Sequence, residues 1–271
     1  MCKRYRNFVR RHRIIKQSTS KLEPSTTGGN KMKGIYNATA GMLNSFAELN
    51  SISNNLANLN TVGYKKDFNL FKSVYEKEIR SYQNAQGKGE PIGNIYSSVV
   101  LDEVIPNLEQ GPLVETSGKL DFAIEGDGFF KIERNGNYFY TRNGEFSLSP
   151  ENYLVTKSGD YVLDEENNPI LVDLDNFFVD EEGNISGTNT RLNILNVENL
   201  NKYGENYFTG EELGQAGNFN MRQGFLESSN VDALNEMIKM IEANRKFDIL
   251  QKAVLTGDSL NAKLIEITSN F

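Results

Sequence analysis

A heptad pattern of apolar residues runs through 35–60, near the start of the chain. Two columns of side chains repeat at a spacing of seven residues and together form the a and d positions of a helical seam. The pattern predicts a helix of about 25 residues, roughly 38 Å long at 1.5 Å per residue. The columns are Ile35, Met42, Leu49 and Leu56, and Ala38, Ser45, Ile52 and Leu59.

The far side of this helix lacks charge, because Glu48 is the only charged residue in 35–60. A helix on a water-exposed surface normally has charged residues on its outer face. The polar positions are asparagines instead, among them Asn54 and Asn58, which lie one helical turn apart. We therefore expect other helices, including those of other copies of the chain, to surround this helix, with Asn54 and Asn58 at the contacts between subunits. Identical copies that meet head to tail without closing a ring would form a helical filament.

A second apolar pattern predicts a helix over 231–267. Its first half has apolar residues at a 3/4 spacing, and the pattern resumes after a phase slip near 244–248 that resembles a coiled-coil stutter. Its other face mixes acidic and basic residues, so we expect one side to meet water. Asp232 lies in the predicted first turn, and 228–230 provides capping oxygens ahead of it. The first-half positions are Val231, Leu234, Ile238 and Ile241.

Between the two helices, short aromatic or β-branched runs alternate with turn residues. Asp127-Gly128, Asn135-Gly136, Asn143-Gly144 and Ser158-Gly159 suit the positive-φ positions of two-residue hairpins. The spacing predicts an antiparallel meander, sandwich or barrel. Strands are expected over 120–125, 129–133, 138–142, 145–148, 153–157, 161–163 and 192–197. Among their residues, Arg142 is expected to be ion-paired.

The predicted fold class is α+β, with N- and C-terminal coiled-coil helices flanking a central antiparallel all-β domain. Gly63, which is free to adopt positive φ, is expected to be a hinge between the first helix and the rest. The connector that follows could be a short amphipathic helix or an extended segment. The expected boundaries are 1–31 for a basic leader, 32–64 for the first helix, 65–93 for the connector, 94–227 for the β domain and 228–271 for the last helix.

Charge is distributed unevenly along the chain. Nine lysines and arginines against one glutamate give 1–31 a charge of +8, while 20 against 35 give the remainder −15. The acidic remainder argues against nucleic acid as its partner. The leader could be a nucleic-acid or membrane tether, but we favour a translated extension ahead of a start at Met32. It has no apolar core of a secretory signal, and the chain has no apolar run long enough to span a membrane.

Catalytic chemistry is limited by composition, because the only cysteine is Cys2 and the only histidine is His12. Thiol and imidazole catalysis and the usual zinc patterns are therefore excluded after Met32. A carboxylate-based hydrolase remains open as an alternative, as does a calcium site in the acidic clusters 164–166, 173–175 and 180–182. Turn charge explains these acids better, so we expect no catalytic residue, cofactor, metal or small-molecule substrate. The carboxylates weighed for catalysis are Asp121, Glu125, Asp127 and Glu145.

Three blocks of sequence resemble the flagellar basal-body rod and hook family of bacteria. Residues 53–65, SNNLANLNTVGYK, are similar to the family's N-terminal signature ANNLAN-x-NT-x-GYK. Residues 120–130, LDFAIEGDGFF, and 140–146, YTRNGEF, resemble its central domain. Residues 223–231, QGFLESSNV, with Met237-Ile238 and Arg245-Lys246-Phe247, resemble its C-terminal signature. The basic leader lies outside the resemblance.

The resemblance implies a structural axial protein without catalysis, whose end helices form the inner tube of the flagellar rod. The tube would transmit torque and pass exported subunits. Partners would be other copies of the chain, neighbouring rod and hook proteins and the flagellar type III export apparatus. The location would be the basal body in the cell envelope, reached without a cleaved signal peptide. The expected assembly residues are Ile35, Met42, Leu49, Ile52, Asn54, Leu56, Asn58, Leu59, Val231, Leu234, Ile238 and Ile241.

Two alternatives within the same class of structural protein are open. A hook-type axial protein shares the three blocks, but the body is shorter than expected for a hook protein. A coiled-coil adhesin would normally have a secretory signal. Within the rod, residues 245–248, RKFD, depart from the Arg-Ala-Tyr-Glu form usual in the distal-rod member, which favours a proximal-rod subunit.

Overall fold

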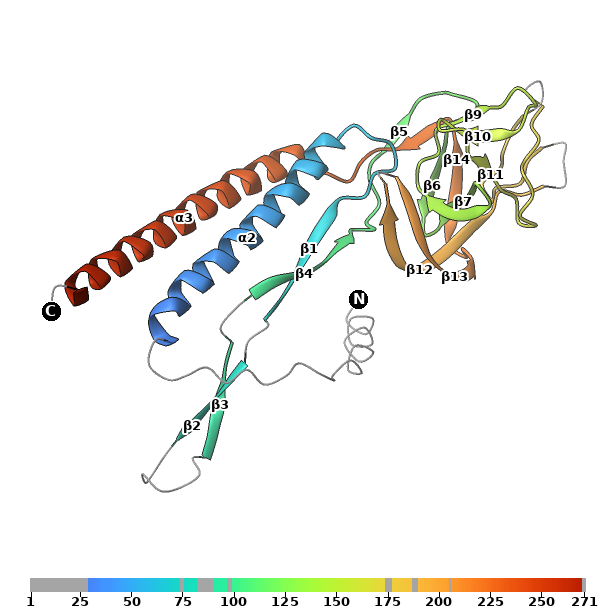
Figure 1. The fold of residues 1–271 in the computed structure, drawn as a ribbon. Helices are drawn as coiled ribbons and strands as arrows, with labels where there is room; N and C mark the ends of the chain where they lie inside the picture. The colour runs from blue at the N-terminus through green and yellow to red at the C-terminus, as the bar shows by residue number, and fades with distance from the viewer. Residues whose placement is uncertain are drawn as a thin grey trace.

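The computed structural model describes residues 29–73, 76–81, 90–96, 99–173, 177–186, 190–204 and 206–269. The predicted leader lies outside the described residues, except for its last three, which belong to the first helix. Two long helices lie side by side and extend from one end of a β-rich body, so the molecule is elongated (Figure 1). The fold is α+β, as predicted, and all strand pairs in the described residues are antiparallel.

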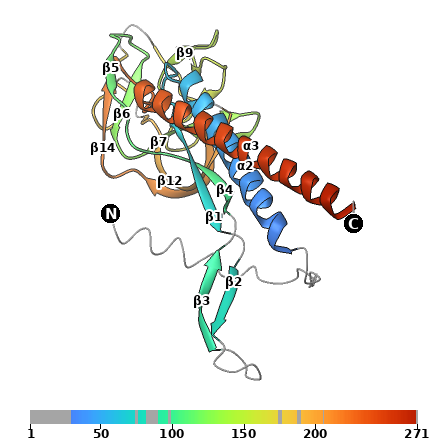
Figure 2. The same cartoon turned by 90° about the vertical axis from the view of Figure 1, so that its left-hand side faces the viewer.

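The two helices are α2 (Gly29–Ala57) and α3 (Ala233–Ser269), which run in opposite directions (Figures 1 and 2). After α2 ends, the Asn58 side-chain amide donates to the Asn54 carbonyl at 2.9 Å, which satisfies one of the carbonyls that the end of a helix leaves free. The cap of α3 is Asp232, whose Oδ1 accepts from the N–H of Leu234 at 3.0 Å. The prediction of capping by 228–230 is therefore wrong by two residues. No helix in the described part of the chain is long and apolar enough to cross a membrane.

The body is built around a seven-stranded sheet in the order β12-β13-β8-β7-β11-β10-β9. Because β12 also pairs with β7, the strands β7, β8, β13 and β12 close into a ring. Each predicted strand is present and begins within two residues of its expected start. The strands of the body are β5 (Leu113–Glu115), β6 (Phe122–Gly126), β7 (Phe129–Arg134), β8 (Asn137–Thr141), β9 (Phe146–Leu148), β10 (Leu154–Thr156), β11 (Tyr161–Val162), β12 (Ile194–Tyr203), β13 (Tyr207–Gln215), β14 (Phe219–Gln223) and β15 (Phe225–Glu227).

Only some of the hairpins predicted from Asn-Gly and Asp-Gly pairs are present in the structure. Asn135 and Gly136, with φ of 52° and 77°, form the predicted two-residue loop between β7 and β8. The hairpins predicted at 127–128 and 143–144 are wrong, since β6 pairs with β14 and β9 pairs with β10. Gly144 is instead a point of close approach: a Cβ there would lie 1.8 Å from the Phe122 carbonyl oxygen.

The hydrophobic core of the body lies between its strands and consists largely of fully buried aromatic and β-branched side chains. Phe130 and Phe146 meet edge to face with ring centroids 5.2 Å apart, and Phe122 contacts both Phe146 and Phe177. Aromatic pairs of this geometry add stability beyond the burial of their area. The body therefore has a core of its own, independent of the two helices.

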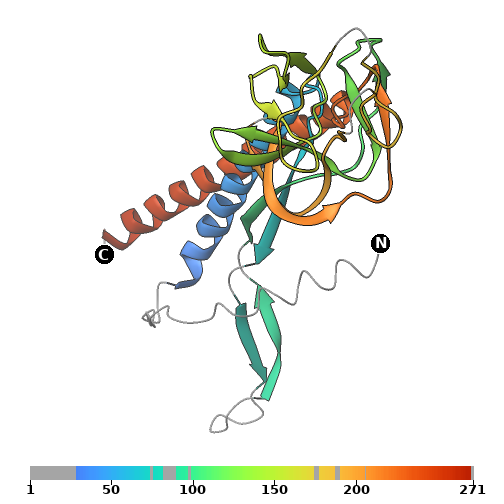
Figure 3. The same ribbon diagram turned by 90° about the vertical axis from the view of Figure 1, so that its right-hand side faces the viewer.

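The segment predicted as a connector forms two antiparallel ribbons, so the helical alternative for it is wrong. Strand β1 (Asp67–Ser73) pairs with β4 (Val99–Pro106), and β2 (Glu76–Ser81) pairs with β3 (Glu90–Tyr96). The β1–β4 ribbon lies along α2, where the Asn44 amide donates to the Val99 carbonyl at 2.6 Å. Figure 3 shows the β2–β3 ribbon projecting away from both the helices and the body. Strand β4 thus lies beside α2, although it was expected within the β domain.

Candidate assembly site and neck

The two helices pack through small side chains. In α2, the column Ala38, Ser45 and Ile52 is buried, as the heptad pattern predicts. A second column of α2 also faces α3, but it is not the predicted column of Met42, Leu49 and Leu56. It contains Gly41, where a Cβ would lie 3.0 Å from a methyl carbon of Leu250. The seam between the helices is thus rotated away from Met42, Leu49 and Leu56, which are half-buried.

This rotation leaves an uncharged surface on the other side of α2, which we call the outer face of α2. It consists of Tyr36, Leu43, Phe46, Asn50 and Asn54, all exposed. The exposed fractions of Tyr36, Leu43 and Phe46 are 71%, 62% and 55%. Glu48, the only charge in this part of the helix, points toward α3 and lies 3.7 Å from Lys246. Contiguous exposed apolar side chains of this kind mark an interaction surface.

A second apolar surface lies on α3, and we call it the α3 stripe. It consists of Leu234, Met237, Ile238 and Ile241, which are all about half exposed or more. Their spacing places them on one face of the helix. Buried Glu236 and Ala243 lie on the opposite face, and Glu236 contacts Asn55 of α2. Both outward faces therefore expose large apolar side chains in the single chain.

The predicted assembly residues fall into three groups in the structure. Asn54 belongs to the outer face of α2, and three residues belong to the α3 stripe: Leu234, Ile238 and Ile241. Half-buried positions at the border of the helix pair are Ile35, Met42, Leu49 and Leu56, with Asn58 and Leu59 in the turn after α2. Ile52 and Val231 are buried within the chain, Val231 ahead of α3. Contacts with other subunits at these positions stay a prediction.

Asn55 is not among the predicted assembly residues, yet its side chain makes four hydrogen bonds in the structure. Its Oδ1 accepts from the Asp67 N–H at 2.8 Å and from the Tyr64 hydroxyl at 3.2 Å. Its amide donates to the Asp67 carbonyl at 3.2 Å and to Glu236 at 3.4 Å. Asn55 thereby joins α2, β1 and α3. A sequence signal for it existed, because Asn55 follows Gly41 and Glu48 at heptad spacing.

Replacing Asn55 by alanine should lower the free energy of unfolding by about 2–4 kcal/mol, because buried donors and acceptors lose their partners. Asn54→Ala is the matched control: it changes the same residue type one position earlier, at an exposed site. Its stability should stay within about 0.5 kcal/mol of wild type. Urea denaturation followed by circular dichroism measures both, and equal midpoints would contradict the role of Asn55.

Three segments lie at the junction of the body with the helices and their ribbon, and we call them the three passes of the neck. They are residues 61–66, which turn from α2 into β1, residues 107–112, which lead from β4 into the body, and residues 224–232, which include β15 and lead from the body to α3. Backbone hydrogen bonds join them in pairs: the Gly63 N–H donates to the Glu227 carbonyl at 2.7 Å, and the Asn107 N–H donates to the Lys66 carbonyl at 2.9 Å. The Ser228 N–H donates to the Pro112 carbonyl at 2.8 Å. Each pass is therefore bonded to another.

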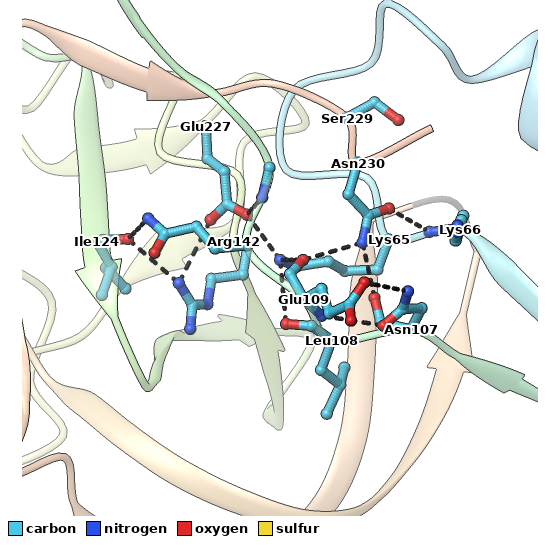
Figure 4. Close-up of polar contacts among 12 residues, drawn as sticks. Lys65, Lys66, Asn107, Leu108, Glu109, Ile124, Arg142, Glu227, Ser229 and Asn230 are labelled. Atoms are coloured by element: carbon cyan, nitrogen blue, oxygen red, sulfur yellow. Dashed lines mark hydrogen bonds and ion pairs between the residues drawn. The ribbon is translucent and has the colours of Figure 1, made fainter. Parts of the chain in front are cut away.

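A buried ion cluster lies in the neck (Figure 4). The Glu227 carboxylate lies 2.6 Å from the Lys65 ammonium and accepts from the Gly111 N–H at 2.9 Å. Its other oxygen lies 3.3 Å from the Arg142 guanidinium. Lys65 also donates to the Glu109 carbonyl at 2.8 Å. Burial lowers the pKa of Lys65 and of Arg142, while the charge of Glu227 opposes the shift in both.

Arg142 brings the body into this cluster. It follows β8, and its guanidinium donates to the Ile124 carbonyl at 3.2 Å (Figure 4). It also donates to the Gly126 carbonyl at 2.7 Å. The expectation that Arg142 is ion-paired is confirmed by its contact with Glu227. Glu227 thus links a cation of the first pass to a cation of the body.

Two further side chains tie the neck together. Asn230 donates to the carbonyls of Asn107 and Glu109, each at 2.9 Å, and accepts from the Lys66 N–H at 2.8 Å. From β12 of the body, Lys202 lies 2.9 Å from Asp67. The same ammonium lies 3.8 Å from the centre of the Tyr64 ring. Asn230 thus joins the passes to one another, and Lys202 joins the body to Tyr64 and Asp67.

Three of the four carboxylates that were candidates for catalysis have other partners. Glu125 lies 2.6 Å from Arg222, and Glu145 lies 2.5 Å from Lys157. Asp121 accepts from the Thr116 hydroxyl at 2.5 Å. In the described part of the chain, no group of three acidic, cysteine or histidine side chains could hold a metal ion.

Two of the three acidic clusters that were candidates for calcium form turns. Asp180 accepts from the N–H groups of Glu182 and Asn184 through one oxygen, and Asp164 bonds the two corresponding N–H groups in the same way. The side-chain amide of Asn184 lowers the pKa of Asp180 by bonding its charged form. Asp175 lies outside the described residues.

Comparison with known proteins gives a consistent result along the chain. A family model for flagella basal body rod protein matches 35–65. A model for the D1 domain of the flagellar hook protein FlgE/F/G matches 123–187, and one for the C-terminal part of the flagellar basal body rod FlgEFG protein matches 222–267. The three matches include most of α2, strands β7 to β11 of the body and nearly all of α3.

Whole-chain relatives are named as rod proteins. The flagellar basal-body rod protein FlgG of Borreliella burgdorferi is 32% identical over 254 residues, which cover 84% of this chain and 96% of that protein. FlgG of Bacillus subtilis is 29% identical over 264 residues, which cover 87% of this chain and 99% of that protein. The flagellar basal-body rod protein FlgF of Caulobacter vibrioides is 31% identical over 231 residues, covering 81% and 91%.

Proposed function

The chain belongs to the family of bacterial flagellar basal-body rod proteins, and on that basis we propose that it is a structural subunit of the rod. It assembles with other copies and with neighbouring axial proteins into a helical tube, which transmits torque and passes exported subunits. The relatives named FlgG and FlgF support the rod over the hook. The protein has a structural role and no catalytic one.

The single observation that supports this proposal best is the uncharged outer face of α2. Exposed leucine, phenylalanine and tyrosine on a long helix have an unfavourable free energy in water. A neighbouring helix removes that cost by covering the face, and the amides of Asn50 and Asn54 can bond across the contact.

We propose that a neighbouring copy covers the outer face of α2 with its own α3 stripe. The two surfaces differ and lie on different helices, so the contact is heterologous and repeats from copy to copy. Heterologous contacts that do not close a ring produce a helical filament. In the filament, the end helices form coiled coils with the residues at the border of each helix pair: Ile35, Met42, Leu49, Leu56 and Leu59. Gly63 connects this inner layer to the body.

The proposed location is the basal body within the cell envelope, and the proposed route is the flagellar type III export apparatus. Two features support that route. The sequence has a single cysteine, so no disulfide within one chain has to form after export. The body and the helices are joined mainly by hydrogen bonds and ion pairs in the neck, which can form again after the chain arrives.

A deletion strain tests the proposal: without the gene, isolated basal bodies should lack an intact rod by electron microscopy, and motility should be lost. Complementation with Asn54→Lys/Asn58→Lys should fail, because two charges would enter a contact between subunits. The matched control is Asn137→Lys/Asn201→Lys, which adds the same charges at exposed asparagines of the body. Both purified variants should keep their strand signal in circular dichroism.

The outcomes separate the two parts of the proposal. Intact rods in the deletion strain would overturn the assigned function. Normal rods with the Asn54 and Asn58 variant would overturn the role of α2 in assembly and leave the function of the family in place.

A further inference from the structure

The peptide segments of the neck do not by themselves fix the orientation of the body relative to the helices. Two of its passes, 107–112 and 224–232, connect the helices and ribbon to the body, while the pass 61–66 turns from α2 into β1 beside them. Peptide segments without cross-links allow the joined parts to rotate, since each has soft dihedral angles. A fixed orientation therefore requires contacts between the passes and between the passes and the body.

Glu227 is the residue that makes both kinds of contact. Its backbone and side chain belong to the third pass and bind the first pass at Gly63 and Lys65. The same carboxylate accepts from Gly111 of the second pass and pairs with Arg142 of the body. Asn230 joins the passes to one another through Asn107, Glu109 and Lys66, and all of these partners are in the neck.

The buried ion cluster is better explained by a role in orienting the body than by a contribution to stability. The side chains of Lys65, Arg142 and Glu227 are at most 5% exposed. Removing such charges from water costs free energy that their attraction barely offsets, and apolar residues of similar volume often stabilise a protein as well or better. Hydrogen-bonded ions differ from apolar packing in requiring defined donor and acceptor directions.

We propose that Glu227 is a positioning residue that holds the body at one orientation relative to α2 and α3. Torque applied to the helices then reaches the body through a rigid neck. The mechanical meaning rests on the proposed function, but the orientation is a property of the single chain and is measured without the rod.

Distance measurement between spin labels tests the proposal on the full chain. In a Cys2→Ser background, cysteines at the exposed positions Asn137 in β8 and Glu242 in α3 carry the labels. Wild type should give one narrow distance distribution. Glu227→Gln keeps the size of the side chain but leaves two buried cations without a counter-charge, so the distribution should broaden about twofold or more. A label pair within α3, at Glu242 and Lys252, should stay narrow in both proteins.

A second variant keeps the proposal falsifiable if Glu227→Gln fails to fold. Lys65→Met/Arg142→Met/Glu227→Leu replaces the cluster by apolar side chains, which should preserve stability. The body-to-helix distribution should broaden in this variant too, while circular dichroism stays that of wild type. A narrow, unshifted distribution in either folded variant overturns the proposal. That result would leave the rod assignment untouched, because rods are assayed separately in the deletion strain.

Discussion

Gly63→Ala should lower the free energy of unfolding by about 3 kcal/mol or more, well beyond the cost of the same change at Gly136. Both glycines have positive φ, 69° at Gly63 and 77° at Gly136, so both variants are subject to the same backbone strain of about 1–2 kcal/mol. Only Gly63 adds a clash. A Cβ there would lie 2.4 Å from the backbone nitrogen of Asn143, whereas nothing lies within 4 Å at Gly136.

Gly136→Ala therefore serves as the control for backbone strain, and its loss should be about 1–2 kcal/mol. Urea denaturation of the two variants beside wild type measures the difference. The clashing atoms at Gly63 belong to the backbone of the body and cannot rotate away as a side chain would. If both variants lose the same free energy of unfolding, the backbones at Gly63 and Asn143 can separate without cost.

This contact also shows what the sequence predicted about the neck. The glycine at position 63 indicated positive φ, and the structure confirms it. The partner of Gly63 is the 142–143 bend, which the Asn-Gly pattern had suggested as a hairpin. A local pattern indicates that a backbone turns, but it contains no information about which distant segment the turn touches.

The strands of the body could be predicted because their signals are local. Aromatic and β-branched runs between turn residues fixed their positions to within about two residues. The β1–β4 ribbon was not predicted, since its partners lie on opposite sides of a segment with no clear periodicity. Its contact with α2 depends on tertiary packing that propensity does not describe.

The buried cluster of the neck was the hardest feature to predict. Lys65 and Glu227 are 162 positions apart, and lysine and glutamate are almost always exposed. A charged residue in a sequence therefore indicates surface unless its partner is known. Arg142 was expected to be ion-paired, but the sequence did not identify Glu227 as its partner.

The heptad pattern gave the right helix and only half of the right seam. The prediction placed Met42, Leu49 and Leu56 in the second column because they are large and apolar. In the structure, the small residue Gly41 packs closely against α3 instead. Two helices approach most closely where side chains are smallest. The larger apolar residues are half-buried beside this seam, and their contact with neighbouring copies stays a prediction.

The largest functional effect is expected from charge on the outer face of α2. Leu43→Lys/Phe46→Lys should abolish rod assembly and motility, because each subunit contact would bury two ammonium groups against an uncharged surface. The body offers a matched pair: Leu213 and Phe178 are each 60% exposed, compared with 62% for Leu43 and 55% for Phe46. Leu213→Lys/Phe178→Lys changes the same residue types at similar exposure, away from the helices.

Soft-agar motility and electron microscopy of isolated basal bodies measure the effect, and thermal unfolding of the purified chains shows whether either variant loses its fold. Both should unfold close to wild type, since exposed substitutions change stability by about 0.5 kcal/mol or less. If only the α2 variant loses its rods, the defect belongs to the contact between subunits. If both variants assemble, the outer face of α2 remains open in the rod, and the apolar residues on it need another partner.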